Sequence, residues 1–348
     1  MGLRAARRRA RRWAIATAVV LAATALISVG AGPVPISPAD SLHVIAHHLL
    51  GTPLDRAVEL SDAIVWDIRV PRTLLGICVG AGLALAGAVL QTLVRNVLAD
   101  PFVLGINSGA STGAALAILT GAGVALGDYA LQGCAFLGAL AASAVLFMVA
   151  RSQGRLTALR LLMAGVALGY ALSAVTSFVI FASDDAQSSR SVMFWLLGSL
   201  GLASFNGSLV VVASIVVLAL VVLVAAAPHL DALAIGDETA WSLGINPERF
   251  RAGLLVIVCL LVGAIVAMAG SISFVGLVVP HLARRVVGGA HRAVLPLSAL
   301  GGAVLLLWAD IGARTLLAPR ELSIGIITAL VGAPFLLLLV RRMYRTTE

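Results

Sequence analysis

The chain has 348 residues, of which 60% are hydrophobic and only 11% are charged. About 25% of a soluble domain is charged, so this chain has too little polar surface to cover a fold in water. Its net charge of +8 comes from arginine, since the sequence contains no lysine. The missing lysine excludes a P-loop lysine and a Schiff-base lysine. Because the arginines lie at the ends of apolar runs, no nucleic-acid partner is expected.

Ten apolar stretches follow one another along the chain. The first, residues 13–32, directly follows six arginines within residues 1–12 and is long enough to cross a bilayer core, which takes about 20 helical residues. A signal peptide cleaved near Ala31 is the alternative. Because lipid offers no partner for backbone polar groups, each stretch is predicted to be a helix. The other nine apolar stretches lie near 72–94, 102–121, 128–150, 161–182, 208–227, 252–271, 274–289, 294–313 and 323–340.

The placement of the arginines predicts the orientation of these helices. With the N-terminus in the cytoplasm and the sides alternating, 18 of the 24 arginines lie inside and 6 lie outside. This bias supports about ten spans with both termini cytoplasmic. The predicted fold is an all-α polytopic integral membrane protein, a single transmembrane domain over residues 1–348.

Two segments between the apolar stretches are long. Residues 33–71 are predicted outside, and their acidic residues and spaced apolar side chains indicate a surface helix. Residues 228–251 are predicted on the cytoplasmic side, where polar ends and a central Gly and Pro predict two short helices joined by a turn. A solvated loop is the alternative, but a segment of this length and pattern favours a docking surface.

A dense run of polar residues and glycine interrupts the chain between the second and third stretches. Irregular backbone at this depth is tolerated only against protein or a water-filled cavity, which indicates a gate or a cavity lining. An ordinary short turn is the alternative, because Asp100 before Pro101 is typical of a helix N-terminus. The residues of this run that we assign to a gate or pathway are Asn96, Asn107 and Ser108.

Charged residues also occur at the predicted outer helix ends. Arg69 and Arg72 precede the second stretch, where exposed cations are available to an acidic partner. Asp310 and Arg314 are four residues apart, so they are placed to pair across one helical turn. A buried carboxylate in a membrane can relay protons, but one beside an arginine is predicted to be a structural ion pair.

No arrangement of residues predicts covalent chemistry. The three cysteines lie far apart inside apolar stretches, and the sequence contains no nucleophile–base pair, metal signature or nucleotide loop. The chain is therefore predicted to be neither an enzyme nor a holder of a metal or cofactor.

Four runs of sequence together resemble the FecCD-type permeases, which import iron–siderophores, haem and vitamin B12 in ATP-binding-cassette systems. The resemblance extends from about Ile64 to Arg342. Val97 and Ser323 depart from it, because the family usually has proline at both positions. The runs are Arg69-Val-Pro-Arg72; Gly87-Ala-Val-Leu-Gln91 with Arg95-Asn96-Val-Leu-Ala-Asp100-Pro101 and Leu104-Gly105; Gly276-Leu-Val-Val-Pro280-His281 with Arg284; and Ala309-Asp310 through Arg314 to Glu321, Gly325, Thr328, Gly332 and Pro334.

The resemblance implies a type II importer, similar in fold to the vitamin B12 permeases. It implies two permease copies, identical or not, on two cytoplasmic ATPase subunits that hold the ATP and magnesium, and a separate external substrate-binding protein. The external arginines implied to meet that protein are Arg69, Arg72 and Arg314. The cytoplasmic residues implied to seat against the ATPase are Gly236, Asp237, Glu238, Leu243, Gly244 and Arg249.

These features predict a multi-pass permease of the bacterial cytoplasmic membrane that works by alternating access. A ferric siderophore is the expected cargo, followed by cobalamin and haem. The alternative is a stand-alone secondary transporter driven by an ion gradient. That class needs intramembrane carboxylates facing a cavity, and only Asp310 qualifies.

Overall fold

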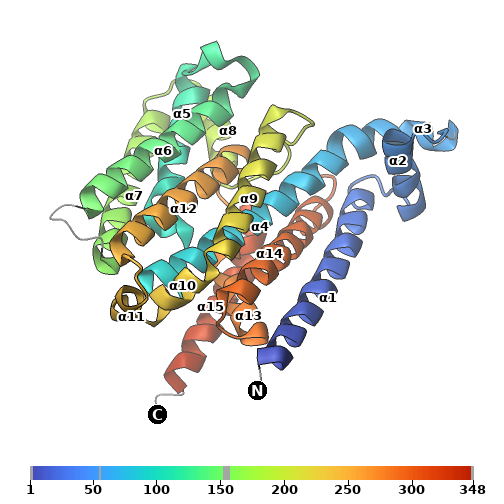
Figure 1. Cartoon of the computed structure of the whole chain (residues 1–348). Helices are drawn as coiled ribbons and strands as arrows, with labels where there is room; N and C mark the ends of the chain where they lie inside the picture. Colours follow the sequence, from blue (N-terminus) through green and yellow to red (C-terminus); the bar gives the residue numbers. More distant parts are fainter. Residues whose placement is uncertain (1–2, 55, 152–156, 346–348) are drawn as a thin grey trace.

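The computed structural model describes residues 3–54, 56–151 and 157–345, and every element within these ranges is helical. Figure 1 shows the helices packed side by side, with α2 and α3 at one end of the bundle and α10 and α11 at the other. In chain order the elements are α1 Leu3–Gly30, α2 Pro38–Leu50, α3 Arg56–Ala63, η1 Ile64–Arg69, α4 Val70–Val94, η2 Pro101–Leu104, α5 Ile106–Thr120, η3 Val124–Tyr129, α6 Ala130–Ala150, α7 Ala158–Phe181, α8 Ala186–Leu196, α9 Gly207–Ala225, α10 Ala227–Ile235, α11 Asp237–Ser242, α12 Pro247–Ala269, α13 Val275–Val287, α14 His291–Thr315 and α15 Ile324–Arg345.

Seven helices of the described chain are long and apolar enough to cross a membrane. Each covers one of the predicted apolar stretches: Ala5–Gly30, Ser61–Val94, Ala130–Ala150, Ala158–Phe181, Gly207–Ala225, Pro247–Ala269 and His291–Thr315. The remaining three predicted stretches are also helical, but α5 has 15 residues, α13 has 13 and the apolar part of α15 is Ile324–Leu339. The count of ten spans and the cytoplasmic position of both termini stay predictions.

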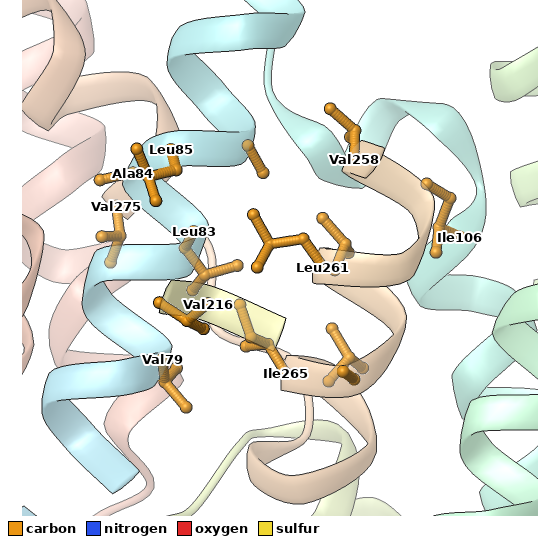
Figure 2. Packing of buried hydrophobic residues seen from close by; sticks show 14 of the residues in the cluster. Val79, Leu83, Ala84, Leu85, Ile106, Val216, Val258, Leu261, Ile265 and Val275 are labelled. Carbon is orange, nitrogen blue, oxygen red and sulfur yellow. The ribbon is translucent and has the colours of Figure 1, made fainter. Parts of the chain in front are cut away.

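Helix α4 lies in the middle of the bundle and packs against α9, α12, α13 and α14 (Figure 1). Its side chains are buried almost from end to end, and Leu75, Leu83 and Leu90 are fully enclosed. Figure 2 shows Leu83 of α4 on the side that faces Leu261 and Ile265 of α12. A helix that is apolar on all sides and buried on all sides is the centre of a bundle.

Glycines on α4 allow its backbone to touch two other helices. A Cβ added to Gly80 would overlap the carbonyl oxygen of Gly302 on α14. A Cβ added to Gly87 would overlap the carbonyl oxygen of Gly276 on α13. Small residues permit this approach in membranes, where packing rather than hydrophobic burial holds helices together.

The outer segment between the first two spans forms its own small core. The predicted surface helix is present as α3, and the π-helix η1 continues it directly into α4. Val29 of α1, Val44 of α2, and Val58 and Val65 of α3 and η1 are buried against one another. Ser37 begins α2 by accepting a hydrogen bond from the Asp40 backbone N–H at 3.0 Å.

The predicted pair of short helices in residues 228–251 is also present. Helix α10 ends at Ile235, α11 begins at Asp237, and the extended Gly236 separates them. Gly244 lies in the left-handed region with φ of 76° and turns the chain toward α12. Asn246 begins α12 by accepting hydrogen bonds from the backbone N–H groups of Glu248 and Arg249, both at 3.1 Å.

The contact between α4 and α13 predicts the effect of a small change. Replacing Gly87 with Val would force apart two backbones that have no flexible side chain to yield, and overpacking of this kind costs about 1–3 kcal/mol. The variant is expected to unfold at a lower temperature in detergent. The matched control is Gly253→Ala on α12, where nothing lies within 4 Å of the added Cβ. Equal unfolding temperatures for the two variants would contradict the close approach.

Candidate functional site

An ion-pair network joins α4 and α14 at the end of the bundle that is predicted to face outside, which we call the outer end. Arg72 Nε donates to Asp310 Oδ1 at 2.9 Å, and Arg72 Nη1 donates to Glu321 Oε2 at 3.0 Å. Arg314 Nε lies 2.9 Å from Asp310 Oδ2, an ion-pair contact that is not aligned as a hydrogen bond. The Asp310 side chain is fully buried, so its charge is balanced by two arginines rather than by water.

Two arginines at this end of the bundle, Arg69 and Arg314, hold the end of α1. Arg69 Nη1 donates to the carbonyl oxygens of Val29 and Gly30 at 2.9 and 2.8 Å. Arg314 Nη2 donates to the carbonyl oxygen and the hydroxyl of Ser28, both at 3.0 Å. The expectation that these arginines are exposed is wrong. Arg69, Arg72 and Arg314 are 5%, 6% and 3% exposed, because each is used in internal hydrogen bonds.

The segment 228–251, which we call the coupling segment, presents apolar side chains at the opposite end. Leu243 is 64% exposed, and Ile235 and Trp241 are 75% and 58% exposed. Glu238, Gly244 and Arg249 are also exposed. Ile235 and Trp241 were not among the predicted site residues, although large apolar residues in a polar loop are a signal of an interaction surface.

Asp237 of the coupling segment pairs with two arginines of the bundle, although its side chain is 44% exposed. Arg251 Nη2 donates to Asp237 Oδ1 at 2.7 Å and Arg251 Nη1 to Oδ2 at 3.0 Å, and Arg95 also donates to Oδ1. The bidentate hydrogen bond from Arg251 is the main reason that the pKa of Asp237 lies below its usual value. The carboxylate is therefore ionised at neutral pH and joins α11 to α4 and α12.

The polar run after α4 forms a capped turn. Asn96 is exposed, and its Oδ1 accepts a hydrogen bond from the Leu98 backbone N–H at 2.9 Å. Asp100 accepts one from the Phe102 backbone N–H, also at 2.9 Å, and begins the short helix η2. Desolvation by the surrounding chain raises the pKa of Asp100 to about 6. The run therefore contains a capped turn at Asp100, as one interpretation predicted, and its Phe102 lines a cavity, as the other predicted.

Asn107 and Ser108 lie one helical turn further along the chain, at the start of α5. Asn107 Oδ1 is buried without a hydrogen-bond partner in the described structure. Ser108 Oγ lies 3.5 Å from Ser173 Oγ of α7. The structure therefore separates Asn96, just after α4, from the two α5 residues, of which Ser108 faces α7.

A cavity of about 700 Å³ opens beside this turn. Phe102 of η2, the end of α8, residues 271–273 and the α15 residues Ala329 and Pro334 line it. Residues 271–273 connect α12 to α13 in a non-helical conformation. Irregular backbone within a membrane is tolerated where it lines such a cavity. Ser271 and Ser273 were not predicted as pathway residues, although they interrupt an otherwise apolar run.

Comparison with known proteins identifies the architecture. Residues 20–342 match the FecCD transport family. The chain belongs to that family. The permease is 38% identical over 370 residues to the cobalamin import system permease protein BtuC of Halobacterium salinarum, covering 97% of this chain and 98% of the relative. It is 42% identical over 282 residues to the hemin transport system permease protein HmuU of Yersinia pestis, covering 80% and 83%.

A solved structure agrees with this membership. An inward-facing metal-chelate type ABC transporter matches the FecCD permease with a TM-score of 0.81 and 31% sequence identity, over 95% of this chain and 99% of that chain. The predicted resemblance is confirmed. The permease is a non-enzymatic membrane subunit of an ATP-binding-cassette importer, and the relatives place ATP hydrolysis on a separate subunit. This membership disfavours the alternative of a stand-alone secondary transporter.

The outer ion-pair network predicts a stability effect in the permease. Arg72→Gln removes one of the two cations at buried Asp310. Breaking a buried pair costs about 3–5 kcal/mol, and we expect about 3 kcal/mol because Arg314 remains. Thermal unfolding in detergent measures the loss. The control is Arg320→Gln, an exposed arginine at the same end, which we expect to change stability by less than about 0.5 kcal/mol. Similar losses in both variants would mean that the network adds little.

Proposed function

We propose that this FecCD permease carries a metal chelate inward through the cavity beside residues 271–273. The proposal rests on one observation: a non-helical segment with two serines lines a space of about 700 Å³ between α8 and α15. A bulky chelate needs a wide path with few specific contacts, and the mostly apolar lining suits one. Ser271 and Ser273 supply the polar groups that hydrate such a path.

A ferric siderophore is the cargo proposed from the sequence. The names of the relatives, cobalamin for BtuC and hemin for HmuU, make those two chelates the competing candidates. All three are bulky metal chelates, and the mostly apolar path offers few contacts that would select among them. Selection is proposed to lie with an external binding protein.

Family membership implies a membrane-embedded assembly with ATPase and binding-protein partners. We propose that two permease copies form the path and that the exposed apolar side chains of the coupling segment seat on the ATPase. Docking of the binding protein on Arg69, Arg72 and Arg314 stays a prediction. It requires these buried arginines to leave their internal partners, so charge reversal there would also unfold the outer network.

Filling the cavity is expected to block transport. Ala329→Trp places a large ring into the lining of the path, whereas Leu338→Trp on the same helix lies outside the cavity lining at an exposed position. ATP-driven uptake into proteoliposomes that contain the whole importer measures the effect. We expect about a tenfold loss for Ala329→Trp and none for Leu338→Trp, a difference of about 1.4 kcal/mol. Equal uptake by both variants would place the path elsewhere.

The same assay compares the three cargoes at equal concentration. Accumulation of the ferric siderophore above cobalamin and hemin would support the proposed cargo. Preferred accumulation of cobalamin or hemin would replace it.

Docking of the ATPase is expected to depend on the exposed end of α11. In one double variant, Leu243 is replaced with Asp and Gly244 with Glu. Docking would then bury two new charges in an apolar contact, and removing charges from water is unfavourable. The ATPase should no longer co-purify with this variant, while the permease keeps the elution volume of the folded protein. The double replacement Asp184→Asn and Asp185→Asn, at the start of α8, is the control. Undiminished co-purification with the Leu243 and Gly244 variant would contradict the proposed docking surface.

A further inference from the structure

Two half-exposed carboxylates of the coupling segment pair with side chains of other helices in the bundle. Asp237 accepts hydrogen bonds from Arg95 and Arg251, as described above. Arg95 also donates to the carbonyl oxygen of Leu233 on α10, with its Nη2 at 3.3 Å. One arginine at the C-terminal end of α4 therefore contacts both short helices of the coupling segment.

The second carboxylate reaches the same turn of α4 through a histidine. Asp231 of α10 accepts a hydrogen bond from the His291 backbone N–H at 2.9 Å, and its Oδ1 lies 2.5 Å from His291 Nδ1. Because a carboxylate only accepts, Nδ1 carries the proton of this hydrogen bond. On the other side of the ring, His291 Nε2 is hydrogen-bonded to Thr92 Oγ1 at 2.7 Å. The imidazole is buried, so it bridges α10 and α4 in a fixed orientation.

Both contacts end at the C-terminal end of α4. Thr92 lies in its last turn, and Arg95 is the cap that follows Val94. The space between the helices is filled as well, because Leu230 and Leu233 of α10 are fully buried in the main core. The coupling segment is thus fastened to the last turn of α4 by packing and by two polar contacts.

The end of α4 that these contacts reach leads directly into the predicted gate residue. Arg95 directly follows α4 as its C-terminal cap and adopts a left-handed conformation with φ of 54°. Asn96, the predicted gate residue, follows it directly. Any movement of the Arg95 backbone therefore also displaces Asn96, because a single planar peptide bond joins the two residues.

We propose that Asp231 and Asp237 link the coupling segment to the end of α4, so that movement of the ATPase-facing surface is passed to the turn at Asn96. The proposal rests on the proposed docking of the ATPase to the coupling segment. It assigns the two carboxylates as positioning residues, which act through Arg95, His291 and Thr92 and do not touch the cargo or the ATPase.

The experiment measures the accessibility of the turn itself and needs no cargo. In the whole importer, with Cys78, Cys134 and Cys259 replaced by Ala, a single Cys is placed at the exposed Val97. Its rate of reaction with a maleimide is measured without nucleotide and with ATP trapped by vanadate. For the unmodified link we expect the two rates to differ by about fivefold or more, the scale of a typical coupling between sites.

The double replacement Asp231→Asn and Asp237→Asn removes both charges from the link. We expect the ATPase to co-purify and to trap nucleotide as before, while the two labelling rates become equal. The matched control is Glu248→Gln, also in the coupling segment, whose carboxylate makes no hydrogen bond or ion pair in the described structure; it should keep the difference between the rates. Arg95→Gln, at a side chain that is 40% exposed, tests the link from α4 and should behave as the double variant does.

Three outcomes would overturn the link. The first is a labelling difference that persists in the double variant, and the second is the same loss of the difference in the Glu248→Gln control. The third is release of the ATPase from the double variant, because the carboxylates would then support docking itself. Failure of the docking proposal is recognised separately, by an ATPase that stays bound to the variant at Leu243 and Gly244.

Discussion

The contact between the backbone of α4 and the backbones of α13 and α14 is the constraint on which the rest of the structure depends. Gly80 and Gly87 allow it, and no side chain stands between the helices at those points. Within a membrane this close packing replaces the hydrophobic effect as the force that joins helices. Because α4 is thereby enclosed, its two ends are the places where it meets charged groups.

Each end of α4 meets one carboxylate held between two arginines. At the outer end, Asp310 lies between Arg72 and Arg314, and at the opposite end, which is predicted to be cytoplasmic, Asp237 lies between Arg95 and Arg251. The burial of the two carboxylates differs. The Asp310 side chain is fully buried and that of Asp237 is 44% exposed, so water screens the inner cluster and leaves the outer one unscreened. The outer cluster is suited to a fixed structural role, and the inner cluster is suited to a contact that moves.

Two stretches of irregular backbone meet beside the cavity. The capped turn at 95–105 and the break at 270–274 lie near each other, and the cavity beside them is lined from both. Lipid cannot satisfy the free backbone groups of such segments, so they are stable only against protein or a hydrated space. This constraint explains why the helices that follow them, α5 and α13, are shorter than a bilayer requires.

Composition and the position of apolar runs determined the membrane class, the helical fold and the general boundaries of the main spans. The reason is that lipid allows few alternatives for a long apolar stretch. Local turn chemistry likewise predicted the cap at Asp100 and the two helices around Gly236, because caps and glycine turns depend on neighbouring residues alone. The motifs themselves identified the FecCD family.

Only the tertiary structure decided which charged residues are exposed. Arginine counting placed Arg69, Arg72 and Arg314 at the outer helix ends, but their burial depends on Asp310, Glu321 and the carbonyl groups at the end of α1, which lie far away in the sequence. In the same way, the sequence placed Asp237 among the residues expected to meet the ATPase and gave no sign of its pairing with Arg95. Arg95 is 142 residues from Asp237, and His291 is 60 residues from Asp231, so no local pattern could reveal contacts that form only when the helices pack.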